Sequence, residues 1–208
     1  MVPSASISTL AVPDSQPSEV ERALHAAARN GDDRHVRALL EAGVFADAFD
    51  ERGRSSLILA AERDHLATMQ VLVEAGAEVD LRDAAKPRWS PLMHALHADC
   101  SRAATALLEW GADARVGDDA GYTALMMAAG RGDCRLVDDL LARGADPMAE
   151  LFLGFTALDY AIGYGHLEIV RALLAAAPQL RSRDNAARRS VLSLADKAGE
   201  EEILALLA

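Results

Sequence analysis

The sequence predicts an all-α fold, a solenoid of stacked helix-turn-helix units, and three observations support this prediction. Leucine and alanine recur in register with a period of about 33 residues. A glycine or an aspartate lies in the middle of each period and divides it into two short apolar segments. Alanine makes up 43 of the 208 residues and aromatic residues only 4%, a composition that suits closely packed helices. A chain of this length can bury a core without disulfides or a metal.

The period is anchored by a leucine that is followed three residues later by an alanine. Successive anchors are 33, 35, 33, 33 and 34 residues apart, at Leu24, Leu57, Leu92, Leu125, Leu158 and Leu192. A second leucine follows each anchor after fifteen residues, at Leu39, Leu72, Leu107, Leu140, Leu173 and Leu207. Apolar residues at helical spacing form one face of a helix, so each unit contains two helices that face a common core.

Each unit is predicted to contain a helix, a turn, a second helix and a polar connection. The turn lies seven residues after the anchor, at Gly31, Asp64, Asp99, Gly132, Gly165 and Gly199. Further glycines can adopt the left-handed conformation that ends a second helix, at Gly43, Gly76, Gly111 and Gly144. This division predicts a flexible tail over residues 1–17 and a repeat domain over 18–208. Its units cover about 18–49, 50–82, 83–117, 118–150, 151–183 and 184–208.

Side-chain caps mark where the first helices begin. A serine or threonine lies two residues before most anchors, at Ser55, Ser90, Thr123, Thr156 and Ser190, where its oxygen can accept a bond from a free backbone N–H. The first unit offers Ser18 and Glu21 instead, which have the spacing of a capping box. We expect the last unit to fray first, because an end unit has a neighbour on one side only.

These residues resemble the ankyrin repeat family, whose units carry Thr-Pro-Leu-His-x-Ala-Ala, then Gly-His, a Leu-Leu pair and Gly-Ala-Asp. The chain has Ser90-Pro91-Leu92-Met93-His94-Ala95, Thr123-Ala124-Leu125-Met126-Met127-Ala128-Ala129 and Gly165-His166, with six units in register over residues 18–208. It departs from the pattern at Asp64 and Asp99 and by two extra residues around Lys86-Pro87-Arg88. The resemblance implies β-hairpin-like connections and a concave face that binds proteins without catalysis.

The net charge bears on the class of partner, and the cysteine content and N-terminal residues bear on the cellular compartment. The net charge is −11, which disfavours nucleic acids and anionic membranes as partners. Only two cysteines occur, and no Lys or Arg precedes Arg22, so we expect a reducing, cytoplasmic compartment and no secretory signal. No segment is long enough to span a membrane. Nineteen arginines against two lysines, with abundant alanine, are typical of a bacterial genome of high GC content.

Motifs for chemistry are largely missing, so we assign no catalytic residue, metal or cofactor. The sequence has no phosphate-binding loop, nucleophile elbow or His-Glu-x-x-His motif. One cluster has partial metal-ligand spacing, and we interpret it as ordinary helix and turn residues: His94, His97, Asp99 and Cys100. We expect His65 and His166 to bond to neighbouring backbone, and Cys100 and Cys134 to remain free thiols.

In the resembled family, partners bind the concave side, which is formed by the connection tips and the exposed face of each first helix. The register places these positions three, five and six residues before each anchor and five and six residues after it. The candidate partner-binding residues are Arg52, Arg54, Arg63, Trp89, His97, Tyr122, Arg131, Phe152, Leu153, Phe155 and Tyr164. Five of the nine aromatic residues fall in this set, and Trp, Tyr and Arg often dominate interface energies.

Two parts of this set have competing interpretations. The apolar connection Leu151–Phe155 either faces a partner or folds onto the neighbouring tip as core. The arginines of the second unit either form a polar face neutralised by Glu51 and Glu62 or steer an acidic ligand. Among the aromatic residues outside these positions, we expect three to pack: Phe45, Phe49 and Trp110.

The favoured function is a monomeric scaffold that binds a protein partner, of unknown identity, through its concave face. An alternative is a secreted effector, or an inhibitor that neutralises a toxic partner. This alternative is suggested by residues 1–18, which contain five serines, three prolines and one charged residue and resemble an unstructured export signal. A flexible tail has the same composition. An enzyme is disfavoured by the missing motifs.

Overall fold

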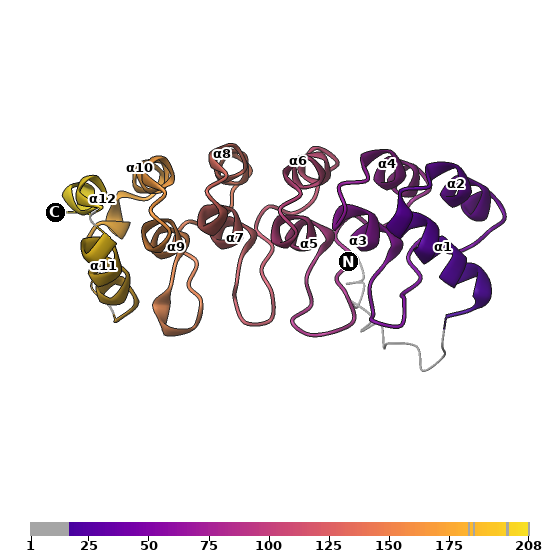
Figure 1. The fold of residues 1–208 in the computed structure, drawn as a ribbon, viewed down its shortest axis with the longest axis horizontal. Coiled ribbons are helices and arrows are strands. Elements are labelled where there is room, and N and C mark those ends of the chain that lie inside the picture. The colour runs from indigo at the N-terminus through magenta and orange to yellow at the C-terminus, as the bar shows by residue number, and fades with distance from the viewer. Residues whose placement is uncertain (1–16, 183, 185, 199, 208) are drawn as a thin grey trace, which may run out of the picture.

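The computed structural model describes residues 17–182, 184, 186–198 and 200–207, and within them twelve α-helices stack as six pairs in a single row (Figure 1). The helices form two layers, and the connections between units project from the inner layer on the side away from the outer layer (Figure 1). The predicted all-α class is confirmed. The predicted tail and the export-signal hypothesis lie outside the described residues, apart from Pro17 and Ser18.

The two layers alternate along the chain. The inner layer contains α1 (Glu19–Asn30), α3 (Ser56–Ala61), α5 (Pro91–His97), α7 (Ala124–Arg131), α9 (Ala157–Gly163) and α11 (Ala186–Ala198). The outer layer contains α2 (Asp33–Glu41), α4 (Leu66–Glu74), α6 (Ser101–Glu109), α8 (Cys134–Ala142), α10 (Leu167–Ala176) and α12 (Glu201–Leu207). Two 3₁₀ turns follow the fourth and fifth units, η1 (Phe152–Gly154) and η2 (Pro178–Leu180). Each helix contacts the next helix of its own layer and the other helix of its own pair.

The anchor leucines form the centre of the core. The first five are all buried, and four of the second leucines are buried beside them: Leu72, Leu107, Leu140 and Leu173. In the last unit the register is different, because Val191 and Ile203 are buried where Leu192 and Leu207 are only partly covered. Among the described residues, no further unit packs against the far side of this one.

Three of the predicted caps are present, at the starts of α3, α5 and α7, whereas at the start of α9 the Thr156 hydroxyl donates to Asp159 Oδ2 at 2.7 Å. The hydroxyl oxygens of Ser55, Ser90 and Thr123 each accept a bond from the backbone N–H three residues on, at 3.4, 3.4 and 3.2 Å. Ser18 and Glu21 form the expected capping box, in which the Ser18 N–H donates to Glu21 Oε2 at 2.7 Å.

The predicted cap at Ser190 is wrong, because α11 begins at Ala186 and Ser190 lies inside it. The early start places Arg188 within the helix, where its Nε donates to Asp159 Oδ1 of α9 at 2.7 Å and its Nη1 to the Leu180 carbonyl at 3.0 Å. A buried ion pair across the last junction therefore accompanies the longer helix.

The connections are short hairpin-like loops, as the resemblance implies. Isolated antiparallel bridges join Phe49 to Ser55 and Gly117 to Thr123. Four loops are closed by a backbone N–H···O bond whose partners are four, six, four and four residues apart: Asp50 to Arg54, Asp83 to Trp89, Asp118 to Tyr122, and Leu151 to Phe155. The wider loop contains the two extra residues that the sequence places near Pro87.

The turn histidines pack against the turn of the preceding unit. As predicted, each ring lies next to backbone, with His65 Nε2 3.2 Å from the Arg29 oxygen and His166 Nε2 3.1 Å from the Gly130 oxygen. The rings also lie over Gly31 and Gly132, where a Cβ atom would come within 2.7 Å of the ring. Glycine is therefore required here both by its positive φ and by the imidazole of the next unit.

The two aspartates that replace this turn glycine face smaller side chains. Asp64 and Asp99 adopt the same left-handed conformation, with φ of 59° and 62°. The residue at the histidine position of the next unit is Cys100 after Asp64 and Asp133 after Asp99. Asp64 uses its side chain across the junction, because its Oδ1 accepts a bond from the Ala103 N–H at 2.7 Å. Asp, unlike most residues, tolerates this conformation.

Two of the three aromatic residues expected to pack are at least partly covered, and one is not. Trp110 packs against the core and Phe49 is partly buried. Phe45 is 68% exposed, so the packing expectation is wrong for it. Phe45 occupies the register position of Asp113 and Asp146, which also face solvent.

A central anchor should carry a large share of the stability. Leu125 is 1% exposed in α7, between two neighbouring units, so Leu125→Ala should lower the free energy of unfolding by about 2–5 kcal/mol. Urea denaturation followed by circular dichroism measures this loss. Leu153→Ala is the control, because Leu153 is 65% exposed and the same truncation there should change the midpoint little. Equal midpoints for wild type and Leu125→Ala would contradict the proposed core.

The contact between Gly132 and His166 can be isolated by a double-mutant cycle. Gly111→Ala should cost only the left-handed conformation, about 1–2 kcal/mol, because no atom lies within 4 Å of its Cβ position. Gly132→Ala should cost about 1–3 kcal/mol more, because its Cβ would overlap the imidazole. Adding His166→Ala should remove this excess when the free energies of unfolding are compared. Equal costs for the two alanine substitutions would show that the ring imposes no constraint.

Candidate partner-binding surface

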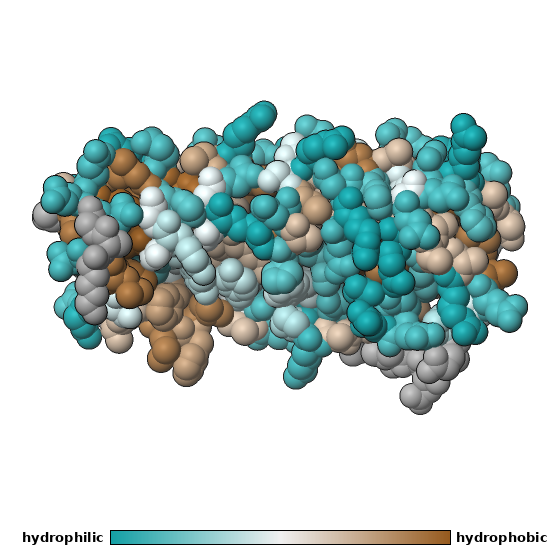
Figure 2. Space-filling model, viewed as in Figure 1, coloured by the Kyte–Doolittle hydropathy of each residue, from teal (hydrophilic) through white to brown (hydrophobic). Residues whose placement is uncertain are grey.

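The apolar end of the candidate surface lies in the fifth and sixth units. Phe152 is 79% exposed and Tyr164 is 67% exposed. Together with Leu153, they are the most exposed apolar side chains among the candidate partner-binding residues. Phe152 and Tyr164 line a groove of about 570 Å³ together with Tyr160 and with Leu194 of α11, which is itself 54% exposed. Figure 2 shows hydrophobic surface gathered at the lower left, where the connection before α9 projects, and hydrophilic surface over much of the middle and right.

The connection Leu151–Phe155 divides between the two interpretations. Phe152 and Leu153 point outward within η1, where Leu153 adopts a φ of 69°. Phe155 is partly buried against the core, with its ring centroid 6.3 Å from that of Tyr160. The tip of this connection, Phe152 and Leu153, is therefore exposed, whereas Phe155 after the tip packs against the core.

The middle of the candidate surface is held by contacts between units. Trp89 Nε1 donates to Asp118 Oδ2 at 3.1 Å, and the Trp89 ring lies 4.7 Å from the His97 ring, centroid to centroid. Arg131 donates to the His97 carbonyl and lies 3.6 Å from Asp99. These side chains join the third unit to the fourth.

Tyr122 is likewise partly covered. Its ring centroid lies 5.3 Å from that of Tyr160 in the next unit. Burial, the largest cause, together with the neighbouring phenols of Tyr160 and Tyr164, raises the pKa of the Tyr122 hydroxyl to about 12. Tyr122 therefore stays neutral at physiological pH and contributes a hydrogen-bonding hydroxyl at the edge of the apolar end.

The second unit contributes a charged network rather than free arginines alone. Arg54 Nη1 donates to Glu62 Oε2 at 3.0 Å and its Nη2 to Asp50 Oδ2 at 3.0 Å. Arg63 lies 3.9 Å from Glu62, whereas Arg52 is exposed and its side chain has no ion-pair partner among the described residues. Arg54 thus fits the self-neutralised polar face, and Arg52 presents its charge to solvent.

The network continues into the third unit through His94, which sequence reasoning placed in a helix without partners. Its Nδ1 lies 2.9 Å from Glu62 Oε1, and its Nε2 lies 2.8 Å from Asp83 Oδ2. Each ring nitrogen therefore lies within hydrogen-bonding distance of one carboxylate oxygen. Glu62 lies 32 residues before His94 and Asp83 eleven before it, so no local motif could reveal the cluster.

The pKa values of two carboxyl groups in this network, those of Glu62 and Asp50, are both lowered. Burial by itself raises the pKa of Glu62, but the hydrogen bond from His94 and the charge of Arg54 outweigh it and hold the pKa below its ordinary value. Burial also opposes ionisation of Asp50, and the backbone N–H groups of Arg54 and Arg52 and the Arg54 guanidinium lower its pKa overall. Both carboxylates are therefore charged anchors at neutral pH.

The four residues with partial metal-ligand spacing are separated by their contacts. His94 binds Glu62 and Asp83, Asp99 pairs with Arg131, and the Cys100 thiol points to the Ala98 carbonyl. Within the described ranges, no group of three or more His, Cys, Asp or Glu side chains is placed to hold a metal ion. Cys100 and Cys134 are free thiols. Among the helices that the structure describes, none combines the length and apolar character of a bilayer-spanning segment.

Three functional candidates were missed by sequence reasoning. Leu194 lies in the last unit, where the register of the other units does not hold. It lines the groove together with Val191, which lies three residues earlier on the same face of α11. Arg22 and Arg29 lie on α1 beside Arg52 and Arg54. Arg29 lies five residues after its anchor, so the register rule finds it once the rule is applied to the first unit as well.

Comparison with known proteins agrees with the stacked architecture. A family model described as "Ankyrin repeats (3 copies)" matches residues 7–83, 83–150 and 125–208. Ankyrin repeat domain-containing protein 63 of Homo sapiens and its counterpart in Mus musculus are each 40% identical to this chain over 105 residues, which is 48% of the chain. The matched region is 27% of the human protein and 26% of the mouse protein, so the chain aligns with about a quarter of these relatives.

Removing the central anion of the network should give a pH-dependent loss of stability. Glu62→Gln leaves Arg54 and His94 without their shared carboxylate, which should lower the free energy of unfolding by about 1–3 kcal/mol at neutral pH. Because the folded pKa of Glu62 lies below its ordinary value of 4.5, its contribution is present above that value and is lost as the pH falls through the folded pKa. The difference between wild type and variant should therefore shrink in acid.

Urea titrations at several pH values measure this difference. Glu109→Gln is the control, since Glu109 is exposed at the end of α6 and belongs to no ion pair among the described residues. A difference that stays constant down to acid pH would contradict the role of the Glu62 charge.

Proposed function

The chain belongs to the ankyrin repeat family, and we propose that it is a non-catalytic scaffold that binds a protein partner through the concave face of its stack. The observation that carries the proposal is the exposed apolar end of this face, where Phe152, Tyr164 and Leu194 line one groove and Leu153 is exposed next to Phe152 in the chain. Contiguous exposed apolar surface next to polar surface marks interaction sites on soluble proteins.

The groove suits an aliphatic or aromatic side chain projecting from a partner segment. Phe152 and Tyr164 offer large apolar area with few rotatable bonds, and Tyr122 and Tyr160 add hydroxyl groups at the edge. Burial of such anchors contributes most of the binding energy of typical interfaces, whereas exposed ion pairs contribute little. The predicted residues in the middle units, Trp89 and Tyr122, support the face by fixing one unit against the next.

The stiffness of the stack supports binding by docking of a preformed surface. The candidate residues lie on connections closed by backbone hydrogen bonds and on helices whose inner sides are buried. A preorganised surface loses little conformational entropy on binding. The clustered titratable groups Glu62, Asp83 and His94 contact one another through both ring nitrogens of His94, which supports a structural role for them rather than a catalytic one. We further propose that the chain acts as a cytoplasmic monomer.

Partner capture with matched variants tests the proposal. The full chain is immobilised, proteins are captured from a native lysate, and wild type is compared with Phe152→Ser/Tyr164→Ala. Loss of two anchors should weaken retention of the specific partner about 30-fold, the change expected for a 2 kcal/mol hot spot. Because both side chains are exposed, the melting temperature should change little.

Phe45→Ser is the matched control, since Phe45 is an equally exposed phenylalanine in the first connection and lies outside the concave positions. It should retain the partner as wild type does. Retention of the same proteins by all three chains would refute binding through the apolar end.

A further inference from the structure

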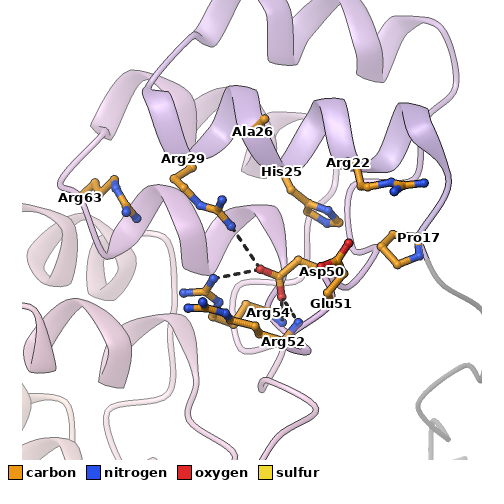
Figure 3. Close-up of a pocket in the computed structure, with 10 residues that line it drawn as sticks. All are labelled: Pro17, Arg22, His25, Ala26, Arg29, Asp50, Glu51, Arg52, Arg54 and Arg63. Carbon is orange, nitrogen blue, oxygen red and sulfur yellow. Dashed lines mark hydrogen bonds and ion pairs between the residues drawn. The ribbon is translucent and has the colours of Figure 1, made fainter.

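A basic pocket lies at the opposite end of the concave face, between the first and second units (Figure 3). It has a volume of about 480 Å³ and is lined by five arginines: Arg22, Arg29, Arg52, Arg54 and Arg63. Two carboxylates, Asp50 and Glu51, also line it, so five positive and two negative charges give a local balance of +3. The whole chain carries −11, so this concentration of positive charge is exceptional for the molecule.

The pocket is held in shape by Asp50 at its centre. Asp50 Oδ1 accepts the backbone N–H groups of Arg52 and Arg54, each at 2.9 Å. Its Oδ2 accepts Arg54 Nη2 at 3.0 Å and Arg29 Nη2 at 3.4 Å, so one carboxylate gathers the loop and α1 (Figure 3). Arg54 Nε is buried and has no hydrogen-bond partner among the described residues. The guanidinium groups of Arg29 and Arg54 are therefore positioned before any ligand arrives.

Part of this positive charge is left available. The side chains of Arg22 and Arg52 are exposed and make no ion pair or hydrogen bond with the described residues. Arg63 lies at the edge of the pocket, 3.9 Å from Glu62, at a distance that leaves its other nitrogens free to bind. Guanidinium groups pair with carboxylates through two parallel hydrogen bonds, which makes arginine well suited to recognise that group.

The repeat register puts the pocket and the apolar groove on the same face. Positions six and five before the anchor and six after it hold charged residues in the second unit and apolar residues in the fifth: Glu51 and Phe152, Arg52 and Leu153, Arg63 and Tyr164. The second unit, which carries the loop of the pocket, precedes the fifth unit, which carries the loop of the groove, by three units. An extended segment of one partner can therefore contact both.

We propose that the basic pocket binds a carboxylate-rich peptide segment of the partner that docks along this face. The proposal rests on the proposed function, because it assigns a chemistry to one end of the same partner. A segment of a few residues fits the pocket volume, whereas a long polyanion such as a nucleic acid would meet the repulsion of the surrounding −11 chain. The acidic segment supplies charge complementarity, and the apolar groove supplies buried area.

A capped tetraglutamate peptide is the probe, titrated calorimetrically into the full-length chain at low ionic strength. Wild type should bind it, added salt should weaken binding, and capped tetraglutamine should not bind. Arg22→Gln/Arg52→Gln should weaken binding about tenfold, the change expected when two exposed charge contacts of up to about 0.7 kcal/mol each are lost. Neither arginine supports the fold through an ion pair among the described residues, so the variant should melt as wild type does.

Arg34→Gln/Arg135→Gln is the matched control. Both residues are exposed on the outer helices α2 and α8, and both double variants lose two positive charges, which takes the net charge from −11 to −13. The control should bind tetraglutamate as wild type does. Equal weakening in both variants would show a general charge effect and overturn the pocket. Absence of binding to wild type, or equal binding of tetraglutamine, would overturn it too.

Two further arms separate related outcomes. A capped peptide with two phosphoserines that binds while tetraglutamate does not would assign the pocket to phosphate and overturn the carboxylate proposal. Phe152→Ser/Tyr164→Ala should bind tetraglutamate normally. If Arg22→Gln/Arg52→Gln loses tetraglutamate binding but Phe152→Ser/Tyr164→Ala captures the partner as wild type does, the apolar groove is contradicted and the basic pocket is supported. If Phe152→Ser/Tyr164→Ala loses the partner but Arg22→Gln/Arg52→Gln binds tetraglutamate as wild type does, the basic pocket is contradicted and the groove is supported.

Discussion

The structure depends on one constraint, which is that no unit can bury its apolar face by itself. The inner helices α3, α5, α7 and α9 contain six to eight residues, fewer than an isolated helix needs to be stable in water. Their leucines become buried only when the neighbouring units cover them on both sides, so stability arises at the junctions between units. The last unit has one such junction, and there the register is different and a buried Arg188–Asp159 ion pair links it to the unit before.

The same constraint decides where function can reside. Leucines, alanines and caps are fixed by stacking, which leaves the connection tips and the outward positions of the inner helices free to differ between units. The chain uses this freedom unevenly along one face, with charged side chains at the N-terminal end and apolar side chains at the C-terminal end. Between these ends, Trp89 and Tyr122 are partly buried, and each contacts the next unit, Trp89 through Asp118 and Tyr122 through Tyr160.

The period in the sequence was sufficient to predict the class, the anchors and most caps, because each depends on residues that repeat within one unit. The failures lie where that assumption ends. Ser190 belongs to α11, which has an inner-layer neighbour on one side only among the described residues, and Phe45 occupies an outward position despite its apolar side chain. The contacts of His94 with Glu62 and Asp83, and the meeting of Arg22 and Arg29 with the loop of the next unit, join different segments of the chain. Such sites depend on how units stack, which no local pattern records.

The packing of each turn histidine over the preceding turn also limits how such arrays can be recombined. A unit that brings an imidazole, as the second and fifth units do, has to follow a unit that ends its inner helix in glycine. The aspartate turns of the second and third units are followed by the smaller Cys100 and Asp133 instead. Deletion, duplication or transplantation of single units would therefore mismatch neighbours at some junctions, whereas transplantation of an adjacent pair would preserve the junction inside that pair. The smallest segment that can be moved without changing such a contact is therefore two adjacent repeats with the junction between them.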